Sequence, residues 1–273
     1  ALCTKNGGKD GLTGIASELL SLTGEQDTKE ELGTNQLKTQ VLEECPSGAE
    51  NCASQNAARA GFQGVREVLV ARPTTVVNGT DIYMLAGIYS RGVTAGTGES
   101  GKYELGILLA GGNVSDDKGG SGKRIYWNGI DALQSSLFET QNHSLEVLFG
   151  SGGSGVKLKD GTLVFPVEGR KKGTRRAKGT VSLIIYSSEV TKGWTLSKGM
   201  SDGGCSDPSV VEWEKDGKLI MMTACDDGRR RVYEIGDKEK SWTEALGTLS
   251  RVWGNPTENE RGVGSGFITA RIE

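Results

Sequence analysis

The segment Ser206-Asp-Pro-Ser-Val-Val-Glu-Trp-Glu-Lys-Asp-Gly-Lys-Leu-Ile-Met-Met-Thr-Ala-Cys225 opens a series of short strand patterns that ends at Trp253. Its Asp216-Gly217 pair lies between two apolar runs, which is typical of a tight β-hairpin. A second turn pattern, Asp226-Asp-Gly228, leads into another strand, and a last strand is expected over Leu249–Trp253. Four short strands joined by turns form one blade of a β-propeller or half of a β-sandwich.

The same order of strand, turn and strand recurs upstream, around Asp160-Gly161 and around Asn78-Gly79. The two Asp-Gly turns, and the tryptophans Trp194 and Trp242, repeat at a spacing of roughly fifty residues, as in long-bladed propellers. This repeat favours an all-β propeller of four-stranded antiparallel blades, with a β-sandwich as the alternative.

Composition and charge limit the class of protein. The chain has 273 residues, and its 42 Gly and 5 Pro suit many tight turns rather than long helices. A net charge of −3 gives no general attraction to nucleic acid or to a membrane. No signal peptide, transmembrane run or anchor signal occurs. Because the chain begins at Ala1 and stops at Glu273 inside a strand pattern, we expect a fragment whose membrane anchor, if any, lies outside it.

Three N-glycosylation sequons begin at Asn78, Asn113 and Asn142, all within predicted turns or loops. Sequons in exposed segments are typical of proteins that pass through the secretory route. They therefore predict a glycoprotein.

Five cysteines support the same route. Cys205 and Cys225 flank the hairpin of the opening segment, so folding of that hairpin brings them near each other. Cys45 and Cys52 lie in a short polar loop, and Cys3 is left over. We expect both pairs to form disulfides. The alternative is five reduced cysteines in a cytosolic protein.

Several kinds of catalytic and metal site are excluded. The single histidine, His143, lies inside the third sequon, which removes Ser-His-Asp and Cys-His mechanisms and multi-histidine metal sites. The Gly-rich segments lack the Lys-Ser/Thr ending of a Walker loop. Asp-Asp pairs at 116–117 and 226–227 are close to turn glycines, so turn formation is favoured over Ca²⁺ binding. We expect no metal and no cofactor.

A cationic loop is expected between two strands. It could hold a sulfated glycan or another acidic partner, or it could be a solvated hairpin tip with no such role. Its six cations are Arg170, Lys171, Lys172, Arg175, Arg176 and Lys178.

Several motifs resemble the trypanosomal trans-sialidase superfamily of surface glycoproteins. The strongest are Ser201-Asp-Gly-Gly-Cys-Ser-Asp-Pro208, Arg229-Arg-Arg-Val-Tyr-Glu234, Ser241-Trp-Thr-Glu-Ala-Leu-Gly247 and Ser250-Arg-Val-Trp-Gly254. Arg72-Pro-Thr-Thr-Val-Val77 and Asp160-Gly-Thr-Leu-Val-Phe-Pro-Val167 extend the match. The loop from Ile235 to Trp242 resembles the family's Asp box and retains Asp237, Ser241 and Trp242.

This resemblance implies an incomplete six-bladed sialidase-type β-propeller of four-stranded antiparallel blades. Residues 1–273 would form a single partial propeller domain, with its first blade truncated and the later blades and any lectin-like domain absent.

The family's chemistry makes specific demands on the site. Sialidases need three arginines that grip the carboxylate of sialic acid, a Tyr nucleophile polarised by a Glu, and an Asp acid/base. By this resemblance, Ala224 replaces the second arginine, Asp207 replaces the glutamate, and Arg72 replaces an aspartate at the pocket rim. The acid/base position falls near Lys9 or Asp10, and the remaining positions lie outside the sequence.

These departures predict a degenerate, catalytically inactive sialidase site. The resemblance then implies a cell-surface protein that binds glycoproteins or glycans of the host cell surface or matrix, acting in adhesion and as a variable antigen. An active exo-α-sialidase or trans-sialidase is the alternative, and Ala224 and Arg72 discriminate between the two. A kelch-like interaction module unrelated to sialidases is a third possibility.

Overall fold

The computed structural model contains antiparallel β-strands and no α-helix among the residues it describes. These are residues 2–4, 13–17, 38–41, 65–69, 72–92, 103–116, 123–134, 145–174, 178–190, 193–213, 217–228, 230–237 and 242–245. Within them, no helix has the length and apolar character needed to cross a membrane.

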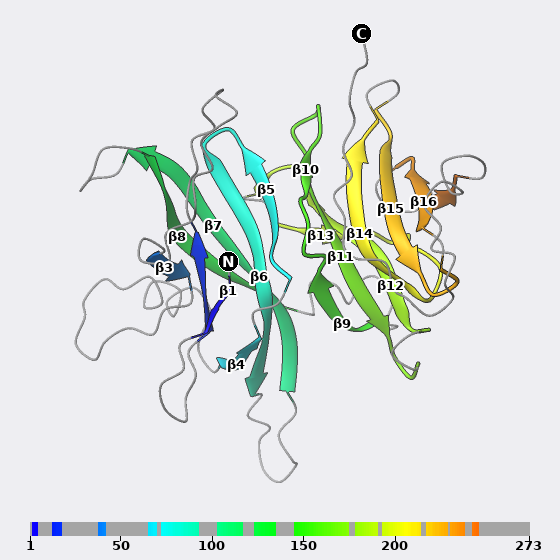
Figure 1. Cartoon of the computed structure of the whole chain (residues 1–273), viewed down its shortest axis with the longest axis horizontal. Helices are drawn as coiled ribbons and strands as arrows, with labels where there is room; N and C mark the ends of the chain where they lie inside the picture. Colours follow the sequence, from blue (N-terminus) through cyan, green and yellow to red (C-terminus); the bar gives the residue numbers. More distant parts are fainter. Residues whose placement is uncertain are drawn as a thin grey trace, which may run out of the picture.

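Four antiparallel sheets follow one another along the chain, and we call them the first to fourth blades (Figure 1). The first contains β1 (Leu2–Thr4), β2 (Thr13–Ser17) and β3 (Lys38–Val41). The second contains β4 (Val65–Leu69), β5 (Thr74–Asn78), β6 (Asp81–Gly92), β7 (Tyr103–Asp116) and β8 (Lys123–Gln134). The third contains β9 (Leu145–Gly150), β10 (Val156–Lys157), β11 (Leu163–Lys171), β12 (Thr180–Ser187) and β13 (Thr195–Leu196). The fourth contains β14 (Cys205–Glu212), β15 (Leu219–Cys225), β16 (Arg230–Ile235) and β17 (Trp242–Glu244).

The first strand is split in two in the second and third blades, and its pairing is irregular in the fourth. In the second blade β4 and β5 both pair with β6, and in the third β9 and β10 both pair with β11. In the fourth blade β14 is continuous, but its pairing with β15 shifts between Ser206 and Ser209. These interruptions contain Arg72, Ser151 and Asp207, respectively.

The interrupted strands of the second and third blades contact each other. The Thr75 amide donates to the Gly153 carbonyl at 3.3 Å, and the Gly155 amide donates to the Thr75 carbonyl at 2.6 Å. Thr75 and Ser154 thereby form an isolated parallel bridge. The glycine-rich segment Gly150–Gly155 therefore carries backbone contacts between the two blades.

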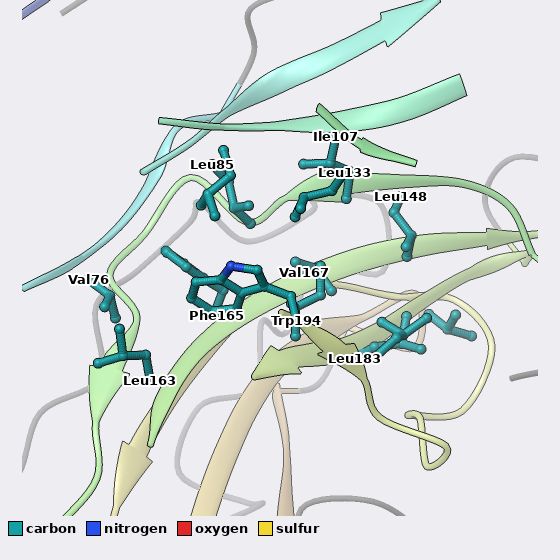
Figure 2. Close-up of a cluster of buried hydrophobic side chains, with 14 residues drawn as sticks. Val76, Leu85, Ile107, Leu133, Leu148, Leu163, Phe165, Val167, Leu183 and Trp194 are labelled. Carbon is teal, nitrogen blue, oxygen red and sulfur yellow. The ribbon is translucent and has the colours of Figure 1, made fainter. Parts of the chain in front are cut away.

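Apolar side chains of the second and third blades pack into one core (Figure 2). Leu85 and Ile107 come from the second blade, and Phe165 comes from the third. The Trp194 ring lies 5.2 Å from the Phe165 ring and 6.4 Å from the Tyr83 ring, measured between centroids. The repeated tryptophan of the third blade therefore packs between two blades.

A second core joins the third and fourth blades. It contains Val164 and Ile184 from the third blade and Val210 and Met221 from the fourth, with Trp242 packed against it. Sheets that stack on one another through apolar faces in chain order form a propeller, as the sequence repeat predicts.

Hairpins form at the predicted turns. Asn78 pairs with Asp81 across a turn in which Gly79 has a φ of 64°, and Gly217 and Gly228 have φ values of 67° and 74°. The predicted strand at Leu249–Trp253 lies outside the described residues. The fourth strand of the fourth blade is instead β17, within a segment that the sequence predicts to be a loop.

Candidate functional site

Arg72, Glu168 and Asp207 form an ion cluster at the strand interruptions. Arg72 Nη1 donates to Glu168 Oε2 at 2.7 Å, and Arg72 Nη2 donates to Glu168 Oε1 at 2.6 Å. Nη2 also donates to Asp207 Oδ1 and, at 3.4 Å, to the Ser151 carbonyl. Because these residues come from three different sheets, the cluster connects the second, third and fourth blades.

The three side chains differ in exposure. The Glu168 side chain is 7% exposed, the Asp207 side chain 23% and the Arg72 side chain 35%. Glu168 Oε1 also accepts a hydrogen bond from the Asp207 amide at 2.5 Å. A buried carboxylate is stable only when it is paired and hydrogen-bonded, so Glu168 depends on both partners.

Arg72 and Asp207 have unusual backbones. Their φ values are 52° and 51°, in the left-handed region that residues other than glycine seldom occupy. Such conformations cost about 1–3 kcal/mol each and persist only where the surroundings impose them, often at functional sites. The surroundings here are the ion cluster and the glycines packed against it.

Two glycines of the third blade allow the Arg72 backbone to approach. A Cβ atom on Gly150 would overlap the Arg72 carbonyl oxygen and lie 3.0 Å from Thr74 Oγ1. A Cβ on Gly152 would lie 3.5 Å from the Arg72 Cβ, and the Gly152 amide donates to Thr74 Oγ1 at 3.1 Å. The glycine-rich segment is therefore part of the site's framework.

Buried hydroxyls position the Asp207 turn from the other side. Thr223 Oγ1 donates to the Ser206 carbonyl at 2.7 Å and lies 2.6 Å from Ser182 Oγ. The Cys205–Cys225 disulfide forms in the structure, with a Cα–Cα distance of 4.0 Å. Ser206, the residue before Asp207, is thus held by the hydrogen bond from Thr223 and by the disulfide at the adjacent Cys205.

The ion cluster keeps Arg72 charged. Burial acts to lower the pKa of Arg72, but its hydrogen bond to Glu168 and the charges of Glu168 and Asp207 raise that pKa above its ordinary value. One cation therefore faces two carboxylates, and the cluster has an excess of negative charge. Such a site attracts cations and repels carboxylates.

Ala224 lies opposite Ser206, the residue that precedes Asp207. It pairs with Ser206 across β14 and β15, and it is 8% exposed. Its methyl group offers no hydrogen-bond donor at the position where the family resemblance places an arginine. The structure thus brings Arg72 and Asp207 into contact and places Ala224 across from the residue before Asp207, whereas Lys9 and Asp10 lie outside the described residues.

Glu168 is the site residue that sequence reasoning missed. It lies within β11, whose first seven residues are all buried. A carboxylate in a strand that is otherwise apolar is a signal for a buried ionic partner. The strand pattern does not identify Arg72 as the partner of Glu168, and it does not show that this partner comes from the second blade.

The Asp box is partly described. Trp242 packs beside Tyr233, with 6.3 Å between ring centroids, and its indole ring lies against Gly199. Asp237 is exposed. The tryptophan of this motif therefore packs within the propeller, away from the ion cluster on the fourth blade's first strand.

The cationic loop forms the hairpin between β11 and β12. Within the described part of the loop, Arg170 Nε donates to Glu146 Oε2 at 3.2 Å. Lys172 and Lys178 are exposed, and Lys171 is half-buried. Because Lys171 follows Glu168 by three residues along β11, the hairpin begins about 10 Å from the ion cluster.

Some of the other predicted site residues lie within the described part of the chain, and some lie outside it. Asn78 is the last residue of β5 and its sequon continues into the hairpin turn at Gly79-Thr80, as predicted. The predicted loop at Asn113 is wrong, because that whole sequon lies within β7, and both asparagines are half-buried. No metal-binding group of three His, Cys, Asp or Glu side chains occurs within the described part of the chain. The predicted residues outside it are Asp10, Cys45, Cys52, Asn142, Arg175, Arg176 and Ser241.

Comparison with known proteins agrees with this architecture. The BNR repeat-like domain family matches residues 1–273. A sialidase of Trypanosoma cruzi is 39% identical over 212 residues, which are 75% of this chain and 17% of the relative. Sialidase 85-1.1 of the same organism is 35% identical over 75% of this chain and 27% of its own length. The match therefore spans only about a sixth to a quarter of these relatives.

A solved structure also matches this chain with a sialidase. Trypanosoma rangeli sialidase in complex with sialic acid superposes with a TM-score of 0.59 at 30% identity, covering 77% of this chain and 33% of that one. The described blades thus correspond to part of a sialidase β-propeller. The chain belongs to the trypanosomal trans-sialidase superfamily.

Proposed function

We propose that this chain is part of a degenerate sialidase propeller that binds glycoconjugates without cleaving them. The observation that carries the proposal is the pairing of Arg72 with Glu168 and Asp207, together with an alanine at position 224, opposite Ser206. Transition-state stabilisation in a sialidase requires cationic donors that converge on the substrate carboxylate. Here one arginine position has no donor, and the cation at the rim is already engaged by two carboxylates.

The shorter carboxylate at position 207 weakens catalysis further. In the family, the corresponding glutamate polarises the nucleophilic tyrosine. Asp207 is one methylene shorter, and its two oxygens accept from Arg72 and from Ser206 Oγ, the latter at 3.2 Å. A carboxylate occupied in this way is poorly suited to activating a nucleophile.

Turnover by the full-length parent protein tests this proposal. The substrates are a fluorogenic sialoside, for hydrolysis, and a sialylated donor with a lactose acceptor, for transfer. We expect neither reaction above the rate of a buffer control. Release or transfer above background would overturn the proposal and favour the alternative, an active exo-α-sialidase or trans-sialidase.

We further propose that recognition has moved to the exposed hairpin at Arg170–Lys178. A cluster of cations on a loop suits an acidic glycan or an acidic protein, and a loop can change without disturbing the core. The test is cell binding by the parent protein with all six cations changed to Ser. Loss of binding supports this location, and undiminished binding that free sialic acid competes away would return recognition to the propeller axis.

The cellular role follows from these proposals. We propose a cell-surface glycoprotein that contributes to attachment to host cells or matrix and varies as an antigen, with residues 1–273 forming part of one propeller domain. The sequons and the Cys205–Cys225 disulfide support an oxidising, secretory location. Surface labelling of intact cells that express the full-length protein would test it.

A further inference from the structure

The acceptors around Arg72 match a guanidinium group closely. Glu168 presents both of its carboxylate oxygens to two nitrogens of Arg72, at 2.7 and 2.6 Å, in the two-pronged arrangement that guanidinium and carboxylate prefer. Asp207 Oδ1 and the Ser151 carbonyl add further acceptors on one side. An ammonium group, which is a compact point charge, could not satisfy this planar set equally well.

The acceptors are held by contacts that do not involve Arg72. Glu168 lies in the middle of β11, which pairs with β9 and β12 on its two sides. Its Oε1 accepts from the Asp207 amide at 2.5 Å, and Asp207 Oδ2 accepts from Ser206 Oγ at 3.2 Å. The receptor is thus built by the third and fourth blades, while the guanidinium comes from the second.

We propose that Glu168 and Asp207 form a guanidinium-binding site that the chain fills with its own Arg72. When the Arg72 side chain is absent, the site accepts a guanidinium from solution or from an arginine side chain of another molecule. This assignment does not depend on whether the protein cleaves sialosides. It states which ligand class the position selects: planar cations, and not the carboxylates that a sialidase site grips.

The electrostatics support this selectivity. With Arg72 removed, the site would hold two carboxylates, one of them in a side chain that is only 7% exposed. A buried, unpaired carboxylate strongly favours the arrival of a cation. A carboxylate ligand would instead add a third negative charge.

The experiment is chemical rescue of Arg72→Ala in the full-length protein. Thermal unfolding is followed with increasing methylguanidinium, with methylammonium at equal concentrations, and with NaCl for ionic strength. We expect a lower Tm for the variant and a saturable recovery with methylguanidinium, since a ligand that binds only the folded state raises its stability.

Methylammonium should bind at least about tenfold more weakly, which corresponds to about 1.4 kcal/mol, and wild type should show no recovery. Equal effects of both cations and NaCl would overturn the proposal.

Two further variants test whether methylguanidinium binds at Glu168 and whether the position requires a guanidinium group. Adding Glu168→Gln to Arg72→Ala should abolish the methylguanidinium effect, and its persistence would place the binding elsewhere. If Arg72→Ala yields no folded protein, Arg72→Lys provides the comparison. The proposal expects a clear loss of Tm in Arg72→Lys because the two-pronged contact is gone, and a wild-type Tm would contradict it.

Discussion

Arg72 and Asp207 occupy corresponding positions in two blades and form an ion pair with each other. Each precedes a proline and has a φ near +50°; Arg72 lies at the break between β4 and β5, and Asp207 at the register shift in β14. Glu168, in the blade between them, accepts hydrogen bonds from the Arg72 guanidinium and from the Asp207 backbone amide. Two equivalent positions of the blade repeat therefore meet in one ion cluster that joins three blades.

Glu168→Gln should destabilise the protein, because a neutral amide has one acceptor where the carboxylate has two facing Arg72. The loss of one charge-assisted hydrogen bond predicts a decrease of about 1–3 kcal/mol in the free energy of unfolding. Urea or thermal denaturation measures it. Glu146→Gln is the matched control, since Glu146 is 51% exposed in its pair with Arg170 and such surface pairs contribute about 0–1 kcal/mol. Equal losses in the two variants would contradict the account.

Gly150→Ala should be destabilising, since the new Cβ would overlap the Arg72 carbonyl oxygen. Overpacking of this kind costs about 1–3 kcal/mol. Gly153→Ala lies in the same segment, where the nearest atom to a new Cβ is Ser151 Oγ at 3.9 Å, and it should change Tm little. A similar Tm for both variants would show that the segment adapts freely and does not hold Arg72.

Tyr233 should make stability fall at alkaline pH. Burial, followed by the charge of Asp202, raises its pKa above the ordinary 10.0, against the lowering effects of the hydrogen bond with the Asp202 backbone and of Arg231. A raised folded-state pKa contributes stability that is complete below about pH 10 and is lost as the pH rises through the folded-state value. Tyr233→Phe should therefore flatten the decline of Tm above about pH 10. An unchanged slope would argue against this assignment.

Two sequons should influence each other. Asn78 pairs with Asp81, which pairs with Asn113, so the two asparagines lie two strands apart, about 10 Å, on one face of the second blade. The Val114 amide also donates to the Thr80 carbonyl at 2.8 Å. We expect glycans at both positions to crowd each other and limit processing. Glycopeptide mass spectrometry of Asn78→Gln should show more extensively processed glycans at Asn113, and an unchanged pattern would contradict this.

Much of the fold could be predicted from the sequence. The Asp-Gly and Asn-Gly turns and the spacing of Trp194 and Trp242 report local geometry and the blade repeat, so they identify hairpins and a propeller. The close packing of the Gly150–Gly155 segment could not be predicted, because composition does not distinguish a glycine that confers flexibility from one that permits close packing. Here the close packing is against Arg72, 78 residues from Gly150 along the chain.

The candidate site could be predicted only in part. The family resemblance identified Arg72, Asp207 and Ala224 as departures, each considered alone. Two of these residues, Arg72 and Asp207, form an ion pair with Glu168 between them. This contact depends on how three blades pack against one another. Contacts over 96 and 135 residues cannot be deduced from local patterns.

Equilibrium binding of sialic acid tests the central claim, that the ion cluster has replaced the carboxylate grip of a sialidase. Isothermal titration calorimetry on the full-length protein compares free sialic acid with its methyl ester, which lacks the charge. We predict no saturable heat for either ligand, because Ala224 offers no donor and Arg72 is engaged by Glu168 and Asp207. Saturable binding of sialic acid that the methyl ester does not reproduce would contradict the account, since it would demonstrate a working carboxylate site.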